Sequence, residues 1–404
     1  MNKYDDLFDE TTPDDSVFAD KGALDPLTEP KETIARDEQE HELATILNGI
    51  HEGYLPPTVS IHGPPGTGKT MTTRRVTQEF ATRTEELAVE YVNLKDCRTV
   101  FSAANEIHLA LTDEKRGAYE GLDGVFEGIW EALTTYPEWT VLILDEIDHV
   151  QHDTNYDPNE FFYRLLRGEG KLARDVQLSC WLLSNELLTV DLRLDSRVQS
   201  VMGDRELFFP PYGHAKLEAI LKPRVEQAFR DGTLSDDTFD HGITKAAYRW
   251  GDARRALRLF RQAGETANER DLEQVTTDCL DTNFDATERE ATIEKLLSLP
   301  PNHFMVLIGV AQWENTRTGE IIQPVTTAQI QESDELTEIG LGNRAVRNLI
   351  MELETMGLVE TWIESKGNEG RVKQVETTFD PQWVHQAVKS YINESDVRSR
   401  SAEE

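Results

Sequence analysis

The segment GPPGTGKT, residues 63–70, combines the residue types that hold the phosphates of a nucleotide. Its three glycines allow the backbone to turn tightly, so that backbone N–H groups face the phosphates. Lys69 would reach the β- and γ-phosphates, and Thr70 would ligate Mg²⁺. A strand precedes the segment and a helix follows it, and the helix N-terminus adds a partial positive charge. The segment therefore predicts a site for ATP or ADP with Mg²⁺.

An acidic segment, VLILDEID at residues 141–148, supplies the second half of such a site. Asp145 ends a buried strand and would hold Mg²⁺ directly or through water, and Glu146 would orient and polarise the attacking water. An Asp–Glu pair alone is a weak signal in so acidic a chain. Its order and distance after residues 63–70 indicate nucleotide hydrolysis, and we expect Asp148 to be structural or solvated.

Three further residues are candidates for contact with the γ-phosphate. Asn185 ends the next strand, where its amide would lie between the water and the γ-phosphate. Arg197 would reach a neighbouring subunit's nucleotide, or would alternatively pair with Asp195 at the surface. Arg254 would contact the γ-phosphate and couple it to domain closure, whereas Arg255 lies about 100° further round the same helix.

We expect the following set of site residues. Catalysis is assigned to Glu146, Asn185, Arg197 and Arg254, and metal binding to Thr70 and Asp145. Nucleotide binding is assigned to Gly63, Pro64, Pro65, Gly66, Thr67, Gly68, Lys69, Thr70, Met71, Tyr212, Lys222 and Arg254.

Four short apolar runs alternate with helical stretches, at residues 58–63, 87–94, 139–148 and 178–186. This alternation is typical of an α/β fold with a parallel sheet and crossover helices. Ligands bind such sheets beyond the carboxyl ends of the strands, where the candidate side chains follow in the sequence.

The rest of the chain lacks this pattern. After residue 212 three helices follow, and the last unit reads as helices closed by a two-stranded hairpin, which suggests a winged helix-turn-helix. We expect a disordered acidic tail at residues 1–30, a nucleotide-binding domain at 31–212, a helical lid at 213–284, a winged-helix domain at 285–395 and a tail at 396–404.

The winged-helix candidate is acidic but has local basic stretches. Residues 288–395 carry 17 acids and nine Lys or Arg. The first turns of the expected recognition helix would meet base edges, and Arg371 on the hairpin would enter a minor groove. The expected DNA contacts are Asn343, Arg344, Arg347, Lys366, Arg371 and Lys373.

The whole chain has 75 Asp and Glu against 41 Lys and Arg, a formal charge of −34. The acids are spread along its whole length, which favours adaptation to molar salt over the alternative, an acidic protein that avoids nucleic acid. Three isolated cysteines exclude a disulfide scaffold and a zinc ribbon. No signal peptide or membrane span is expected, so we predict a cytoplasmic protein.

These segments in this order resemble the AAA+ ATPases: GPPGTGKT, VLILDEID, LLSN, SRV and GDARRAL. With YVNLKDCRT, FPPY and the terminal winged helix, residues 32–390 resemble the archaeal replication initiators of the origin-recognition and cell-division-control type. The resemblance implies that an ATP-bound AAA+ domain and a winged helix grip origin duplex DNA and help to recruit or load the replicative helicase. It also implies an adenine pocket near Arg36 and Asp37, and a DNA-touching element at about 99–112.

Three functions remain open from the sequence. The first is an initiator that uses slow ATP hydrolysis as a switch and associates with itself on nucleoid DNA. The second is another AAA+ motor or clamp-loader-type ATPase with a winged helix, which would turn over ATP quickly without site preference. The third is a nonenzymatic regulator, which would need a damaged acidic pair, whereas Asp145 and Glu146 are both present.

Overall fold

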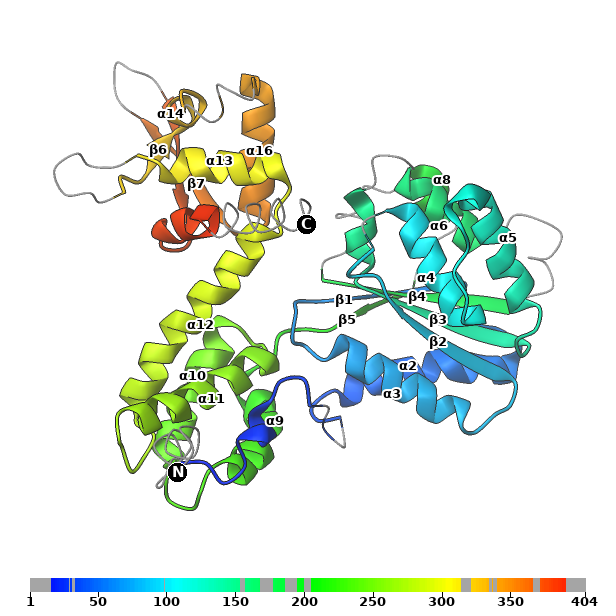
Figure 1. Ribbon diagram of the computed structural model, residues 1–404, viewed down its shortest axis with the longest axis horizontal. Coiled ribbons are helices and arrows are strands. Elements are labelled where there is room, and N and C mark those ends of the chain that lie inside the picture. The colour runs from blue at the N-terminus through cyan, green and yellow to red at the C-terminus, as the bar shows by residue number, and fades with distance from the viewer. Residues whose placement is uncertain are drawn as a thin grey trace, which may run out of the picture. The chain divides into compact units, whose positions relative to one another are not determined.

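The computed structural model divides into two compact units, Met1–Leu280 and Asp281–Glu404, each with its own hydrophobic core. Figure 1 shows both units. The described residues are 16–28, 30, 33–97, 99–152, 157–167, 177–185, 195–199, 205–313, 321–333, 336, 340–365 and 371–389.

The first unit is built on a five-stranded parallel sheet in the order β2-β3-β4-β1-β5. All seven residues of the inner strand β3 are buried, because neighbouring strands flank it and helices cover both faces. This confirms the predicted α/β fold; the three-residue strand β5 was not predicted. The strands are β1 (Thr58–His62), β2 (Leu87–Asn93), β3 (Trp139–Asp145), β4 (Gln177–Ser184) and β5 (Glu206–Phe208).

Helices cover the two faces of this sheet in separate groups (Figure 1). Leu142 and Leu144 of β3 pack in the core formed with α4 (Val100–Thr112), α5 (Gly121–Leu133) and α6 (Pro158–Arg167), whereas Val141 and Ile143 pack toward α2 and α3. This alternation follows from the two-residue period of a strand. The remaining elements here are α2 (Asp37–Asn48), α3 (Lys69–Ala81), α8 (Ser196–Gln199), and the short 3-10 helices η1 (Lys21–Leu24), η2 (Gly49–Glu52), η3 (Ala118–Glu120) and η4 (Ile147–His152).

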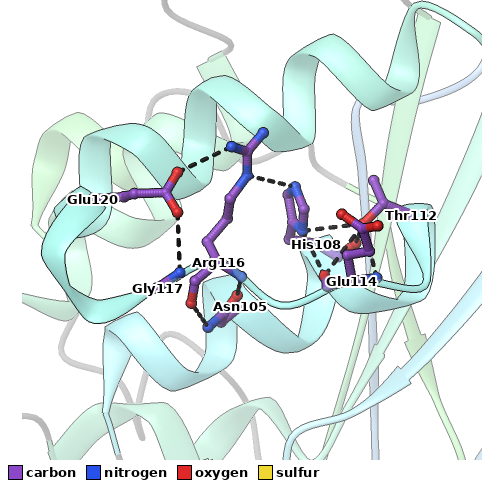
Figure 2. Close-up of polar contacts among 7 residues, drawn as sticks. All are labelled: Asn105, His108, Thr112, Glu114, Arg116, Gly117 and Glu120. Carbon is purple, nitrogen blue, oxygen red and sulfur yellow. Dashed lines mark hydrogen bonds and ion pairs between the residues drawn. The ribbon is translucent and has the colours of Figure 1, made fainter.

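Hydrogen bonds hold the segment between α4 and α5 against α4 (Figure 2). The side chain of Asn105 accepts from the Arg116 backbone N–H at 2.8 Å and donates to its carbonyl at 3.0 Å. His108 Nδ1 lies 2.8 Å from the Glu114 carbonyl, and Arg116 Nε donates to His108 Nε2 at 3.1 Å. Every residue of α4 is buried or half-buried. This segment was expected to touch DNA, and that contact stays a prediction.

A helical lid follows the sheet, formed by α9 (His214–Ala228), α10 (Asp236–Arg249), α11 (Ala253–Glu269) and the start of α12 (Thr277–Leu297). The N-terminal segment 16–28 packs on this lid. The Phe18 ring stacks on Phe229 with centroids 5.1 Å apart, and Leu24 is fully buried. Arg224 donates to the carbonyls of Ala23 and Asp25 at 2.8 and 2.6 Å.

The prediction of a disordered tail was therefore wrong for residues 16–28. The prediction rested on the nine acids and two Lys of residues 1–30, whereas Val17, Phe18 and Leu24 are apolar and are buried by a lid surface that is distant in sequence. Residues 1–15 lie outside the described part of the chain.

The second unit has a three-stranded antiparallel sheet in the order β6-β8-β7. Helices packed with a hairpin confirm the predicted winged helix. The domain boundary placed at 284/285 falls inside α12, which is continuous. The elements are α13 (Pro301–Ala311), β6 (Val325–Thr326), α14 (Thr327–Gln331), α16 (Asn343–Thr355), β7 (Val359–Ser365) and β8 (Arg371–Thr377).

Two further predictions concern the described helices and the cysteines. Every helix in the described part of the chain is too short or too polar to cross a lipid bilayer. Cys97, Cys180 and Cys279 are buried free thiols.

Candidate nucleotide site and nucleic-acid interface

The loop between β1 and α3 approaches the lid and the segment before it so closely that two of its positions require glycine. Gly66 has φ 71°, and a Cβ there would lie 1.8 Å from Asp252 Oδ1. Gly68 has φ 85°, and a Cβ there would lie 2.7 Å from the Tyr212 hydroxyl. Both conformations lie in the left-handed region that glycine enters without strain. The structure therefore places the expected residue Tyr212 directly against this loop.

Lys69 is 8% exposed and points back into the loop. Its ammonium group donates to the carbonyls of Gly63 and Pro64, the latter at 3.0 Å, and lies 3.4 Å from Asn185 Oδ1. Burial lowers the pKa of Lys69 to about 8, against the opposing effect of Glu146 and two neighbouring carboxylates. Phosphate oxygens could replace these carbonyl oxygens as acceptors of the Lys69 ammonium group.

Asp145 and Thr70 form the arrangement expected of a metal site. Thr70 Oγ1 donates to Asp145 Oδ2 at 2.8 Å, and the Glu146 backbone N–H donates to Asp145 Oδ1 at 3.0 Å. Hydroxyl and carboxylate oxygens are the hard ligands that Mg²⁺ prefers. The residues present fit Mg²⁺ at this position.

Tyr91 also reaches Asp145, and sequence reasoning missed it. The Tyr91 hydroxyl donates to Asp145 Oδ2 at 2.8 Å. Burial, followed by the charge of Asp145, raises the pKa of Tyr91 to about 12, so its hydroxyl keeps its proton. The sequence offered one signal: Tyr91 lies two residues before the end of β2. Because Asn93 pairs with Asp145 at the ends of β2 and β3, a tyrosine at this place is near Asp145.

Glu146 and Asn185 lie together at the ends of β3 and β4. Asn185 Nδ2 donates to Glu146 Oε2 at 3.1 Å and lies 3.4 Å from Asp148 Oδ2. Glu146 has φ 55°, a left-handed conformation that costs free energy in a residue with a side chain. Such strain is common where a side chain must be aimed at a reacting group, and Glu146 is the candidate base.

The first turn of α11 brings the lid to the same loop. Asp252 caps this helix by accepting from the N–H groups of Arg254 and Arg255 at 2.8 and 3.1 Å. Arg255 Nε lies 3.5 Å from Asp252 Oδ2, whereas Arg254 is exposed and its charge acts on Lys69. Burial raises the pKa of Asp252. Of the two adjacent arginines, Arg255 is the one that pairs with Asp252.

Arg36 joins the loop to the segment that precedes the lid. It is 1% exposed, and its guanidinium lies 3.8 Å from the centre of the Tyr212 ring. Nε donates to the Thr67 carbonyl at 2.9 Å, and Nη2 donates to the Pro210 carbonyl at 2.7 Å. Burial lowers the pKa of Arg36 from its ordinary value.

Two expected residues are not brought to this site by the contacts of the described residues. The Lys222 side chain is exposed and lines a hollow in the lid with Phe229 and Phe239. Arg197 is 62% exposed and pairs with Asp195 at 2.7 Å, which was the alternative expected for it. The roles of Lys222 in nucleotide binding and of Arg197 in a neighbour's site stay predictions, as does that of the half-buried Met71.

The expected DNA contacts are distributed over α16 and the hairpin. Asn343, Arg344 and Arg347 are exposed on the first turns of α16. Lys373 on β8 pairs with Glu354 of α16 at 3.7 Å. Arg371 begins β8, and Lys366 lies outside the described residues.

The sheet order, the phosphate loop before α3, the acidic pair ending β3 and the helical lid define the AAA+ class of ATPases. A family model described as "AAA domain" matches residues 56–179. A second, described as "Cdc6 AAA+ ATPase-type lid domain", matches residues 218–283. Membership of this class implies nucleotide binding.

Comparison with known proteins gives the particular family. The chain is 31% identical over 380 residues to ORC1-type DNA replication protein 1 of Methanosarcina mazei, covering 92% of this chain and 90% of that protein. It is 31% identical over 383 residues to ORC1-type DNA replication protein 1 of Aeropyrum pernix, covering 92% and 94%. The structure of Aeropyrum pernix ORC1 in complex with DNA matches with a TM-score of 0.68 at 28% identity, covering 92% and 97%. The chain belongs to the archaeal ORC1-type DNA replication proteins, which confirms the resemblance inferred from its motifs.

Proposed function

We propose that this chain is a replication initiator that binds origin duplex DNA in its ATP-bound form and helps to recruit or load the replicative helicase. The observation that carries the proposal is the likeness, over 92% of the chain, to an ORC1 protein whose structure was solved with DNA. The proposed location is the cytoplasm, on nucleoid DNA, with self-association on the DNA through Arg197.

The winged helix supports DNA binding by its local charge. Arg344 and Arg347 form no ion pair within the described part of the chain, although the chain as a whole carries a formal charge of −34. Two exposed guanidinium groups on the first turns of α16 are therefore available to bases or phosphates. In concentrated salt, counterion release supplies little affinity, so hydrogen bonds and DNA shape would carry more of it.

The nucleotide site supports a switch. When ATP binds, Lys69 would exchange its loop carbonyls for phosphate oxygens, while Thr70 and Asp145 would hold Mg²⁺. The bound cation would neutralise phosphate charge. Glu146 would polarise the attacking water, with Asn185 orienting it.

The lid would couple this exchange to the rest of the chain. Ala253 N–H donates to the Gly66 carbonyl at 3.3 Å, which joins the start of α11 to the phosphate loop. A change at the loop would therefore move Arg254 and the lid. Slow hydrolysis would then convert a DNA-engaged form to a released one.

Footprinting in molar KCl with ATP tests DNA binding. We expect wild type to protect a discrete site on candidate origin DNA, and Arg344→Ala to weaken protection about tenfold, as for the loss of one base contact. Arg289→Ala is the matched control, because Arg289 is an exposed arginine on α12 outside the expected interface. Uniform protection of any DNA, or equal loss in both variants, would refute the proposal and favour a motor or clamp-loader function.

A further inference from the structure

Tyr91 contacts Asp145, Asn93 and Arg74, although it lies outside the phosphate loop and the acidic segment at residues 141–148. Its hydroxyl donates to Asp145 Oδ2 at 2.8 Å and accepts from Asn93 Nδ2 at 3.2 Å. The guanidinium of Arg74 lies 4.5 Å from the centre of its ring. The tyrosine is thus held at both its ring and its hydroxyl.

The helix that follows the phosphate loop, α3, supplies Arg74 and also a second donor to Asp145, which is Thr70. Thr70 and Arg74 are four residues apart in α3, so they lie on the same face of this helix. Thr70 donates to Asp145 Oδ2, the same oxygen that Tyr91 contacts, while Arg74 covers the tyrosine ring. The carboxylate of Asp145 is therefore oriented from α3 and from β2 together.

We propose that Tyr91 is a positioning residue that sets the affinity of the site for the divalent cation bound with ATP. The inference rests on the proposed Mg²⁺ site at Thr70 and Asp145. A donor that fixes the orientation of a metal-binding carboxylate raises the affinity for the metal, and its removal typically costs 10–100-fold. The hydroxyl of Tyr91 makes this contact, and the guanidinium of Arg74 lies over the half-buried ring.

The chain offers a matched control, a tyrosine whose carboxylate partner lies on the same strand as Tyr91. Tyr136 donates to Glu90 Oε1 at 3.1 Å, and Glu90 lies in β2 next to Tyr91. Tyr136→Phe and Tyr91→Phe therefore remove the same atom and the same kind of tyrosine–carboxylate bond. Only Tyr91→Phe removes a hydrogen bond to Asp145.

The test is a titration of the full chain with a fluorescent ATP analogue, first in EDTA and then with increasing Mg²⁺. We expect the half-saturating Mg²⁺ concentration to rise about tenfold or more in Tyr91→Phe and to stay at the wild-type value in Tyr136→Phe. Affinity in EDTA and the melting temperature should change no more in Tyr91→Phe than in the control.

Two results would overturn the proposal. One is an unchanged half-saturating Mg²⁺ concentration in Tyr91→Phe. The other is an equal loss of affinity in EDTA and in Mg²⁺, which would show that the hydroxyl only supports the loop. If the binding of the ATP analogue to wild type does not depend on Mg²⁺, the proposed metal site itself is wrong. A failure of the proposed DNA binding would be seen in the footprinting experiment and not in this titration.

Discussion

The affinity for ATP should fall as the pH rises from 7 to 9, because the pKa of Lys69 is lowered to about 8. Burial is the main cause, and the carboxylates of Glu146 and Asp145 only partly offset it. Above this pKa the amine is neutral and loses its attraction for phosphate. The perturbation is therefore pH alone, applied to the unmodified protein.

The magnitude follows from the fraction of charged Lys69. With a pKa of about 8, roughly nine-tenths of the protein carries the charge at pH 7 and roughly one-tenth at pH 9. If the charged form is the one that binds, the apparent Kd is the intrinsic value divided by this fraction. The Kd for ATP should therefore rise about tenfold between pH 7 and pH 9.

Isothermal titration calorimetry at constant ionic strength would measure this dependence. Lys69→Arg is the control, because a guanidinium stays charged over the whole range. We expect weaker but pH-independent binding from this variant. A wild-type Kd that is constant from pH 7 to pH 9, or the same tenfold rise in Lys69→Arg, would refute the reasoning.

Three other predictions concern hydrolysis, the N-terminal segment and salt. Glu146→Gln should keep ATP binding and lower the rate of phosphate release by about 100-fold or more, and an unchanged rate would exclude Glu146 as the base. Phe18→Ala should lower the free energy of unfolding by about 3 kcal/mol in denaturant titrations, whereas Leu27→Ala, at a side chain 85% exposed, should have little effect; equal effects would contradict the packing of Phe18 on the lid. The formal charge of −34 predicts a melting temperature that rises with KCl concentration, and a constant value would count against adaptation to molar salt.

Local pattern was sufficient for the sheet and the phosphate loop. Strands β1 to β4 are apolar runs with clear ends, and the motif at residues 63–70 needs only its own spacing and its flanking elements. Strand β5 was missed because three residues alternating in exposure carry too little periodicity. Met71 was expected in the site because it adjoins the phosphate loop, and Lys222 because it is basic. Neither property determines what a side chain contacts, so both roles stay predictions.

Charge and composition were less reliable guides to order. Residues 1–30 carry nine acids and two Lys, yet Phe18 and Leu24 within them pack on the lid. The partner surface lies about two hundred residues away in the chain, so no local pattern could reveal it. Lys373 was expected to be free for DNA, and its pairing with Glu354 depends on how the hairpin folds back on α16.

The amino-acid sequence by itself determined that a nucleotide site, a lid and a winged helix occur in this order, because each is encoded by residues close together in the chain. Only the tertiary structure decided which side chains complete the site. Tyr91 meets Asp145 because β2 and β3 pair in one register, and Arg36 meets Thr67 and Pro210 because segments far apart in sequence pack together. Such contacts depend on strand register and helix packing, which arise from the burial of the whole core.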